Sequence, residues 1–274
     1  MINFDGLIKN LRGIWGRAYV RIIGVNREPS WLLFELFFPL LPICAFAFVY
    51  KSMNAPSDYL GFVILGGAMT AIWMNVLWGM AAQFFWERES GNLTLYMLCP
   101  MPTMAVLIGM AIGSGFSTFF RVIITFMIGK LIFGITLHIA SYYWLFITFT
   151  LTIAAVFSLG MMMASFFLLY GRDAWNILTV FMEPVFFLSG FYFPVKTLGY
   201  PLGAIASLIP ITLGLDAMRQ LAFKLGPATA FLPVGAEISI LAALTIIYLA
   251  GAKYLLNKLE YLGRCEGRLT LRWQ

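Results

Sequence analysis

Charged side chains are scarce in this chain. Asp, Glu, Lys and Arg make up 11% of the 274 residues, and hydrophobic residues make up 61%. A typical soluble domain carries roughly 25% charged residues, so the composition excludes an ordinary water-soluble domain and predicts an integral membrane protein. Apolar runs of about 18 residues or more recur along the whole sequence, and they leave no room for a sizeable soluble catalytic domain.

Histidine and cysteine are also rare. The only histidine is His138, and Cys44, Cys99 and Cys265 lie far apart without the spacing of a zinc site or a redox pair. We therefore predict no metal site and no catalytic residues. A membrane-embedded enzyme is disfavoured further because paired carboxylates, an HExxH motif and a Ser/His arrangement are missing.

The apolar runs predict an all-α membrane protein with six transmembrane helices. A first run is kinked by Pro39 and Pro42, and a stretch broken by proline and glycine at 191–227 predicts a re-entrant hairpin near the outer surface. At 7–25, apolar side chains share one helical face and predict an interfacial amphipathic helix. The six spans are expected at 31–50, 60–86, 103–133, 142–170, 175–190 and 232–256.

These elements predict one membrane domain covering 1–274. Its expected parts are the interfacial helix (1–29), spans one to five (30–190, with a loop at 87–100), the re-entrant segment (191–227), span six (228–257) and a tail (258–274). Lys and Arg cluster before the first span and after the last, so the positive-inside rule predicts that both termini are cytoplasmic. The chain is expected in the cell membrane, with the 87–100 loop on the cytoplasmic side.

This loop contains the densest charge between two apolar runs, Glu87-Arg88-Glu89-Ser90-Gly91-Asn92-Leu93, and Pro100 follows it. An ionised Arg or Asp at the bilayer centre costs about 2.5 to 3.5 kcal/mol, so this stretch must turn at a membrane surface. Its second half is predicted to be a short amphipathic helix.

The segment from Trp86 to Pro100 resembles the coupling segment of ABC-2 type transporter permeases, in which an ERExG-type start leads into a short leucine-rich helix ending in proline. Asn92 departs from the pattern, because a threonine or a similar residue is expected there. The resemblance implies that this loop contacts an ATPase partner, with Glu89 orienting the turn and a glycine permitting its backbone geometry. The implied coupling residues are Glu87, Arg88, Glu89, Ser90, Gly91, Leu93, Leu95 and Pro100.

A second motif, Leu188-Ser-Gly-Phe-Tyr-Phe-Pro194, resembles the outer re-entrant signature of the same family. Such a segment is expected to close the exit of a pathway, to meet its twin across a dimer axis, or to act only as a structural lid. The residues implied are Ser189, Gly190, Phe193, Pro194, Pro210, Asp216 and Arg219.

The resemblance implies a permease subunit of an ATP-driven ABC exporter that moves a drug, a lipid or a lipid-linked glycan. A second permease copy, identical or related, would complete the pathway within membrane lipid, and a separate ATP-binding subunit would hold MgATP. The chain itself has no GxxxxGK[ST] motif, needs no cofactor and is not expected to hydrolyse ATP or to bind nucleic acid.

Ionisable and aromatic side chains inside the spans are candidates for a pathway. Arg121 and Glu183 lie deep in their spans, where they either pair with each other or contact a substrate. Trp73 and Trp78 either line the pathway or pack in the bundle. The alternative function is an ATP-independent secondary transporter or channel, which would cluster several polar groups in broken helices at mid-membrane.

Overall fold

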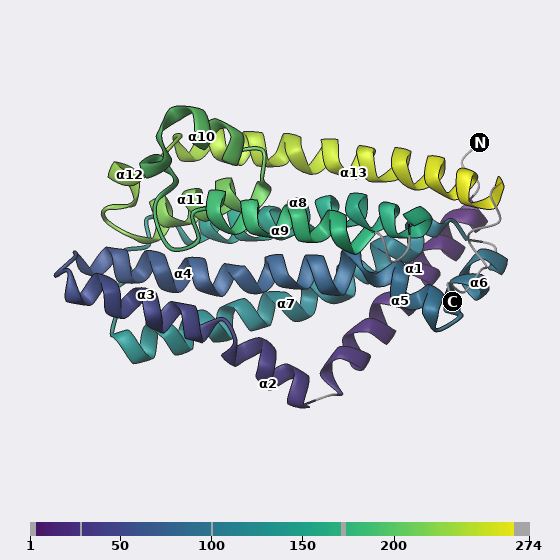
Figure 1. Ribbon diagram of the computed structural model, residues 1–274, viewed down its shortest axis with the longest axis horizontal. Helices are drawn as coiled ribbons and strands as arrows, with labels where there is room; N and C mark the ends of the chain where they lie inside the picture. The colour runs from purple at the N-terminus through teal and green to yellow at the C-terminus, as the bar shows by residue number, and fades with distance from the viewer. Residues whose placement is uncertain (1–3, 28, 100, 171–173, 266–274) are drawn as a thin grey trace.

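The described part of the chain is built from helices without strands. The computed structural model describes residues 4–27, 29–99, 101–170 and 174–265 (Figure 1). A chain surrounded by lipid must satisfy its backbone polar groups internally, which long helices do. Five helical stretches in the described residues are long and apolar enough to cross a membrane, at 33–52, 57–89, 103–133, 142–167 and 234–262. The prediction of an all-α integral membrane protein is confirmed.

The first of these stretches is broken near its middle. Helix α2 (Pro29–Phe37) and helix α3 (Leu40–Ser52) meet at a turn that contains Pro39. Proline lacks the backbone N–H that a continuous helix needs and its ring crowds the preceding turn, so the predicted kink is confirmed at Pro39. Pro42 lies in the first turn of α3, where no helical partner is lost.

The second stretch contains a π-helical turn, which was not predicted from the sequence. Helix α4 (Ser57–Met74) passes into a π-helix, η1 (Asn75–Ala81), before α5 (Gln83–Glu89) completes the stretch. A π-helical turn inserts extra backbone into an α-helix and changes the direction of the side chains beyond it. Side chains of η1 therefore face the cavities described below.

Three later helices agree with the predicted spans, and one is shorter. Helices α7 (Thr103–Phe133) and α8 (Tyr142–Tyr170) have the predicted bounds, and α13 (Val234–Cys265) extends past the predicted end. Helix α9 (Ala174–Leu188) has 15 residues and contains Pro184, fewer than the about 20 residues that cross a bilayer as a helix. The sixth crossing therefore stays a prediction.

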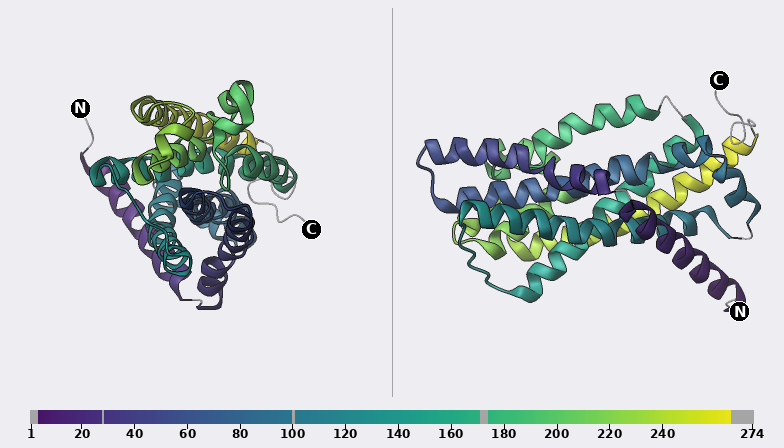
Figure 2. Two further views of the ribbon diagram at one scale, coloured as in Figure 1. Left: turned by 90° about the vertical axis from the view of Figure 1, so that its left-hand side faces the viewer. Right: turned by 90° about the horizontal axis from the view of Figure 1, so that it is seen from below.

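Helix α1 (Phe4–Asn26) slants across one end of the bundle (Figure 2) and packs on α7. Two glycines of α7 allow the close approach: a Cβ added to Gly113 would lie 2.7 Å from the Ala18 carbonyl oxygen, and one added to Gly109 would lie 2.6 Å from that of Ile14. Glycine spaced four residues apart presents a flat helix face. The exposed side of α1 carries large apolar residues, as an interfacial helix requires: Leu11, Trp15, Tyr19 and Val20.

The two ends of the bundle differ in structure. The start of α1, the end of α13, α5 and helix α6 (Asn92–Leu98) lie at one end (Figure 1). The segment at 191–227, which is interrupted by proline and glycine, forms short helices at the other end of the bundle, where the turn between α3 and α4 also lies (Figure 1). These pieces are the 3₁₀ turn η3 (Val195–Leu198) and the helices α10 (Gly199–Ala206), α11 (Pro210–Ala222) and α12 (Gly226–Thr229).

Candidate functional site

The charged loop folds into a sharp bend between α5 and α6, here called the elbow (residues 83–98). Gly91 makes the bend with φ +79°, a left-handed conformation that costs other L-residues roughly 1 to 2 kcal/mol. The left-handed backbone at Gly91 agrees with the prediction that a glycine permits the geometry of this turn. Pro100, the last of the predicted coupling residues, lies outside the described residues.

The carboxylate of Glu87 holds the elbow together. It forms an ion pair with the guanidinium of Arg17 on α1, and it accepts hydrogen bonds from Gln83 Nε2 (2.7 Å), Asn92 Nδ2 (3.0 Å) and Tyr96 Oη (3.2 Å). Burial raises the pKa of Tyr96 to about 12, so its phenol stays a donor. Asn92, the departure from the family pattern, thus has a role in closing the bend.

The remaining elbow residues separate into buried and exposed groups. The prediction that Glu89 orients the turn is wrong: Glu89 and Ser90 point to the outside, and Glu87 does the orienting. Arg88 is 4% exposed, and its guanidinium nitrogens have no hydrogen-bond acceptor among the described residues. Leu93 is buried and Leu95 is 59% exposed. The elbow therefore presents a carboxylate and a leucine to its surroundings.

A polar cavity of about 800 Å³, here called the vestibule, lies between α1, α2, η1 and α5. Arg21 projects into it and donates from Nε to Ser114 Oγ (3.0 Å) and from Nη2 to the Gly79 carbonyl oxygen (2.9 Å). The other lining residues are Arg17, Val20, Gly24, Glu35, Asn75, Trp78, Gln83, Trp86 and Glu87.

A more apolar cavity of about 340 Å³, here called the chamber, adjoins the vestibule. The two cavities share Glu35, Asn75 and Trp78. In the chamber wall, Arg121 forms an ion pair with Glu35. The chamber is otherwise lined by Phe34, Phe38, Pro39, Pro42, Thr70, Ala71, Met74, Phe186 and Tyr192.

These contacts correct two hypotheses about the spans. Arg121 does not pair with Glu183, because the break at Pro39 brings Glu35 beside it while Glu183 is exposed on α9. Trp73 is fully buried in the bundle core and lines neither cavity. Trp78, in contrast, is 47% exposed and lines both cavities. Pathway candidates in the structure are therefore Trp78 and Arg121, without Trp73 and Glu183.

At the opposite end, Arg219 joins its own helix α11 to α4 and to the turn at 191–193. Its guanidinium donates to the carbonyl oxygens of Phe193 (3.0 Å), Phe191 (2.9 Å) and Phe62 (3.1 Å), and the side chain has no exposed surface. These carbonyls hold the guanidinium inside the protein. The α11 residues and the turn at 189–194, which provides two of these carbonyls, are here called the cap.

Other residues of the outer signature also serve the cap. Asp216 accepts a hydrogen bond from the Phe231 backbone N–H (2.8 Å), and Ser189 is fully buried. Gly190 turns the chain with φ +64°, and Pro194 and Pro210 stand immediately before η3 and at the first position of α11. The predicted outer residues are thus brought together in one structure, with Phe193 providing a carbonyl to Arg219.

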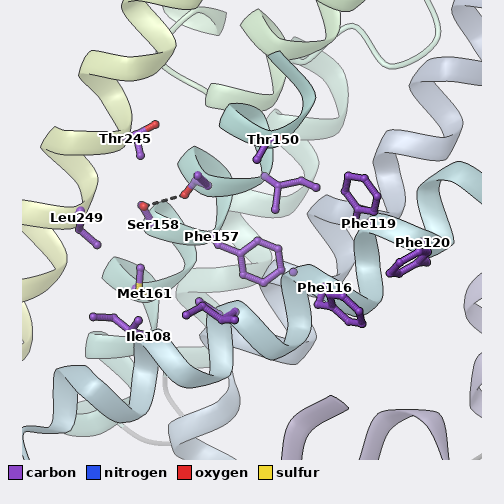
Figure 3. Close-up of a pocket in the computed structure, with 15 residues that line it drawn as sticks. Ile108, Phe116, Phe119, Phe120, Thr150, Phe157, Ser158, Met161, Thr245 and Leu249 are labelled. Carbon is purple, nitrogen blue, oxygen red and sulfur yellow. Dashed lines mark hydrogen bonds between the residues drawn. The ribbon is translucent and has the colours of Figure 1, made fainter. Parts of the chain in front are cut away.

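A third cavity, of about 630 Å³, opens between α7, α8 and α13 (Figure 3). Phe116, Phe119 and Phe157 line it, and the Ser158 hydroxyl is turned to the Ala154 carbonyl oxygen of its own helix (2.8 Å). Its described lining residues include no ionisable side chain. The hydroxyls of Thr150, Ser158 and Thr245 all donate to carbonyl oxygens of their own helices, so this cavity has the character of a lipid-facing surface.

Comparison with known proteins supports the two motifs. A family model described as ABC-2 type transporter matches residues 19–223, which include α4, the elbow, the Arg121 pair and the cap up to Phe223. A search among curated proteins gives no match. The matched range covers most of the chain, so the chain belongs to the ABC-2 type transporter family and is the membrane-embedded permease component of an ABC-type transporter.

Proposed function

We propose that this chain is the permease subunit of an ATP-driven exporter in the cell membrane, with both termini in the cytoplasm. Permeases of this family lack an ATP-binding site and generally work with an ATP-binding subunit. Such a subunit would bind MgATP and dock on the elbow. The start of α1 and the end of α13 lie at the elbow end of the bundle (Figure 1), which supports one common side for these parts.

The observation on which the proposal rests is the ion pair that connects the elbow to α1, between Glu87 and Arg17. A partner that moves the elbow would also move α1 through the Arg17 ion pair, and α1 packs against α7 along the glycines. Packed helices shift as rigid bodies, so a closing motion of the ATPase would tilt the helices around the vestibule. Exposed Glu89 and Leu95 are the side chains that we propose to contact the partner.

A second copy of the permease would complete the pathway. Helix α9 lines the chamber with Phe186 and exposes Val180 (71%) and Phe187 (60%) on its other faces. These side chains are suited to contact a second copy or lipid. We propose that the cap closes the outer end of the pathway as a rigid lid, since Arg219 on α11 binds one carbonyl of α4 and two of the turn at 191–193.

The test is to reconstitute the chain with an ATP-binding subunit in proteoliposomes and to measure ATPase activity and transport over a panel of drugs, lipids and lipid-linked glycans. We expect at least one compound to stimulate ATP hydrolysis and to accumulate in the compartment away from the ATPase. A partner variant without hydrolysis is the control. Transport that proceeds equally without ATP would support a secondary transporter or channel and contradict the proposal.

A further inference from the structure

The vestibule and the chamber are adjacent, and together they are here called the compartment, which is polar at the vestibule end and apolar at the chamber end. They share Glu35, Asn75 and Trp78, and their volumes of about 800 and 340 Å³ suit small-molecule sites, which measure roughly 300 to 1,000 Å³. The vestibule reaches the elbow at Glu87, and the chamber reaches Tyr192 beyond the end of α9. A ligand that fills both would have one polar and one apolar end.

The charges lining this compartment do not balance. Arg17 is paired with Glu87, and Arg121 is paired with Glu35. Arg21 forms no ion pair with a carboxylate of the described residues, and its hydrogen-bond acceptors are the neutral Ser114 hydroxyl and a backbone carbonyl. Among the described lining residues, the compartment therefore carries three arginines against two glutamates, and Arg21 is the arginine outside the two ion pairs.

Arg21 remains charged in this setting. Burial, reinforced by nearby Arg17, lowers the pKa of Arg21 to about 10, so the guanidinium is protonated at neutral pH. Glu87 acts on Arg21 in the opposite direction, but this carboxylate is already in an ion pair with Arg17. A partly buried charge whose hydrogen-bond acceptors are neutral is costly unless a further opposite charge approaches it. The planar guanidinium binds phosphate and carboxylate groups through two parallel N–H donors, and such an anion would supply the missing counter-charge.

The chamber provides the apolar half. Phe34 and Phe38 lie with ring centroids 5.1 Å apart in its wall, and Pro42, Met74 and Phe186 add further apolar surface. Transfer of an alkyl chain from water to such a surface gains about 0.8 kcal/mol for each buried CH₂ group. The ion pair of Arg121 and Glu35 marks the border between the polar and apolar halves.

From this arrangement we infer that the compartment binds a chain amphiphile with an anionic phosphate or carboxylate headgroup. The headgroup lies in the vestibule against Arg21, and the hydrocarbon chain lies in the chamber beside Trp78. The inference names the substrate class of the proposed exporter and in that respect rests on the proposed function, whereas binding itself requires only the compartment.

The test uses the complex of the chain with its ATP-binding subunit in nanodiscs of neutral lipid. The probe is dodecyl phosphate with a brominated chain, which quenches nearby indoles. The signal of Trp78 is isolated as the difference between the wild type and Trp78→Phe. Two variants of α1 are compared: Arg21→Gln, which removes the unpaired charge, and Arg12→Gln, which removes an equal charge from the exposed side of the same helix.

We expect saturable quenching in the wild type and in Arg12→Gln, and a concentration for half-saturation that is roughly tenfold or more higher in Arg21→Gln, as the loss of a charged hydrogen bond implies. A brominated dodecyl trimethylammonium probe should quench weakly and equally in all variants. Inorganic phosphate should compete poorly, because it lacks the chain. Arg21→Lys, which keeps the charge without the planar fork, should bind better than Arg21→Gln.

Equal half-saturation in Arg21→Gln and Arg12→Gln would overturn the inference, as would equal quenching by the cationic probe. Competition by inorganic phosphate at the same concentrations as the amphiphile would point to a simple phosphate site and overturn it as well. Basal ATPase activity of each complex reports assembly separately. Binding without any stimulated ATPase or transport would contradict the proposed function and leave the inference standing.

Discussion

The elbow allows a sharp prediction, because one buried carboxylate holds it and a neighbouring carboxylate does not. Glu87→Gln removes the ion pair with Arg17 while it keeps the size of the side chain. Breaking a buried ion pair by removing one partner costs about 3 to 5 kcal/mol. We expect about 3 kcal/mol here, since the Arg17 side chain is 14% exposed and regains some water.

A loss of about 3 kcal/mol corresponds to a roughly 100-fold increase in local opening, at 1.36 kcal/mol for each factor of ten. Amide hydrogen exchange of α5 and α6, measured by mass spectrometry in nanodiscs, reports this opening. Glu89→Gln is the matched control, because Glu89 is exposed and lies two residues away. Its exchange should stay within about twofold of wild type.

The reasoning about the elbow would be refuted by two results. One is exchange in Glu87→Gln that equals the wild type, and the other is equally fast exchange in Glu89→Gln. For the ATPase of the assembled complex we expect a different pattern: Glu89→Gln should weaken stimulation through lost partner contact, although its elbow stays closed.

The remaining predictions concern packing and buried charge. Gly113→Ala should lower the thermal unfolding midpoint by several degrees, because its Cβ would lie 2.7 Å from a carbonyl oxygen of α1, whereas Gly16→Ala, with open space around it, should not. A double-mutant cycle with Glu35→Gln and Arg121→Gln should give a coupling of about 1 to 3 kcal/mol in unfolding free energy, and zero coupling would contradict the ion pair. Arg219→Met should destabilise the cap by more than about 2 kcal/mol, seen as faster exchange at 191–193, because three carbonyl oxygens lose their donor.

The hydropathy of the sequence and the positions of its prolines and glycines predict much of the fold. The bounds of α7 and α8, the break at Pro39 and the left-handed turn at Gly91 follow from apolar length, the missing proline N–H and the freedom of glycine. These features depend on a residue and its near neighbours only.

Contacts between residues far apart in the chain could not be predicted from the sequence, and the reason is physical. Arg121 meets Glu35 because the π-helical turn and the proline break set the direction of two helices, and neither angle is encoded in a periodicity. Arg219 is buried because three carbonyl oxygens converge on it, two from the turn at 191–193 and one from the distant helix α4. Arg21 belongs to the cluster of Lys and Arg before the first span, and its place in the vestibule depends on the close packing of α1 on the α7 glycines.

The most direct test of the account is where the ATP-binding subunit contacts the chain. We would place the photo-crosslinking residue p-benzoylphenylalanine at Leu95 of the elbow and, as a control, at Tyr200 of α10, since both side chains are exposed and they lie at opposite ends of the bundle (Figure 1). Irradiation of the assembled complex should join the ATP-binding subunit to the chain from Leu95 and not from Tyr200. A crosslink from Tyr200, or none from Leu95 in a complex that hydrolyses ATP, would contradict the elbow as the docking site.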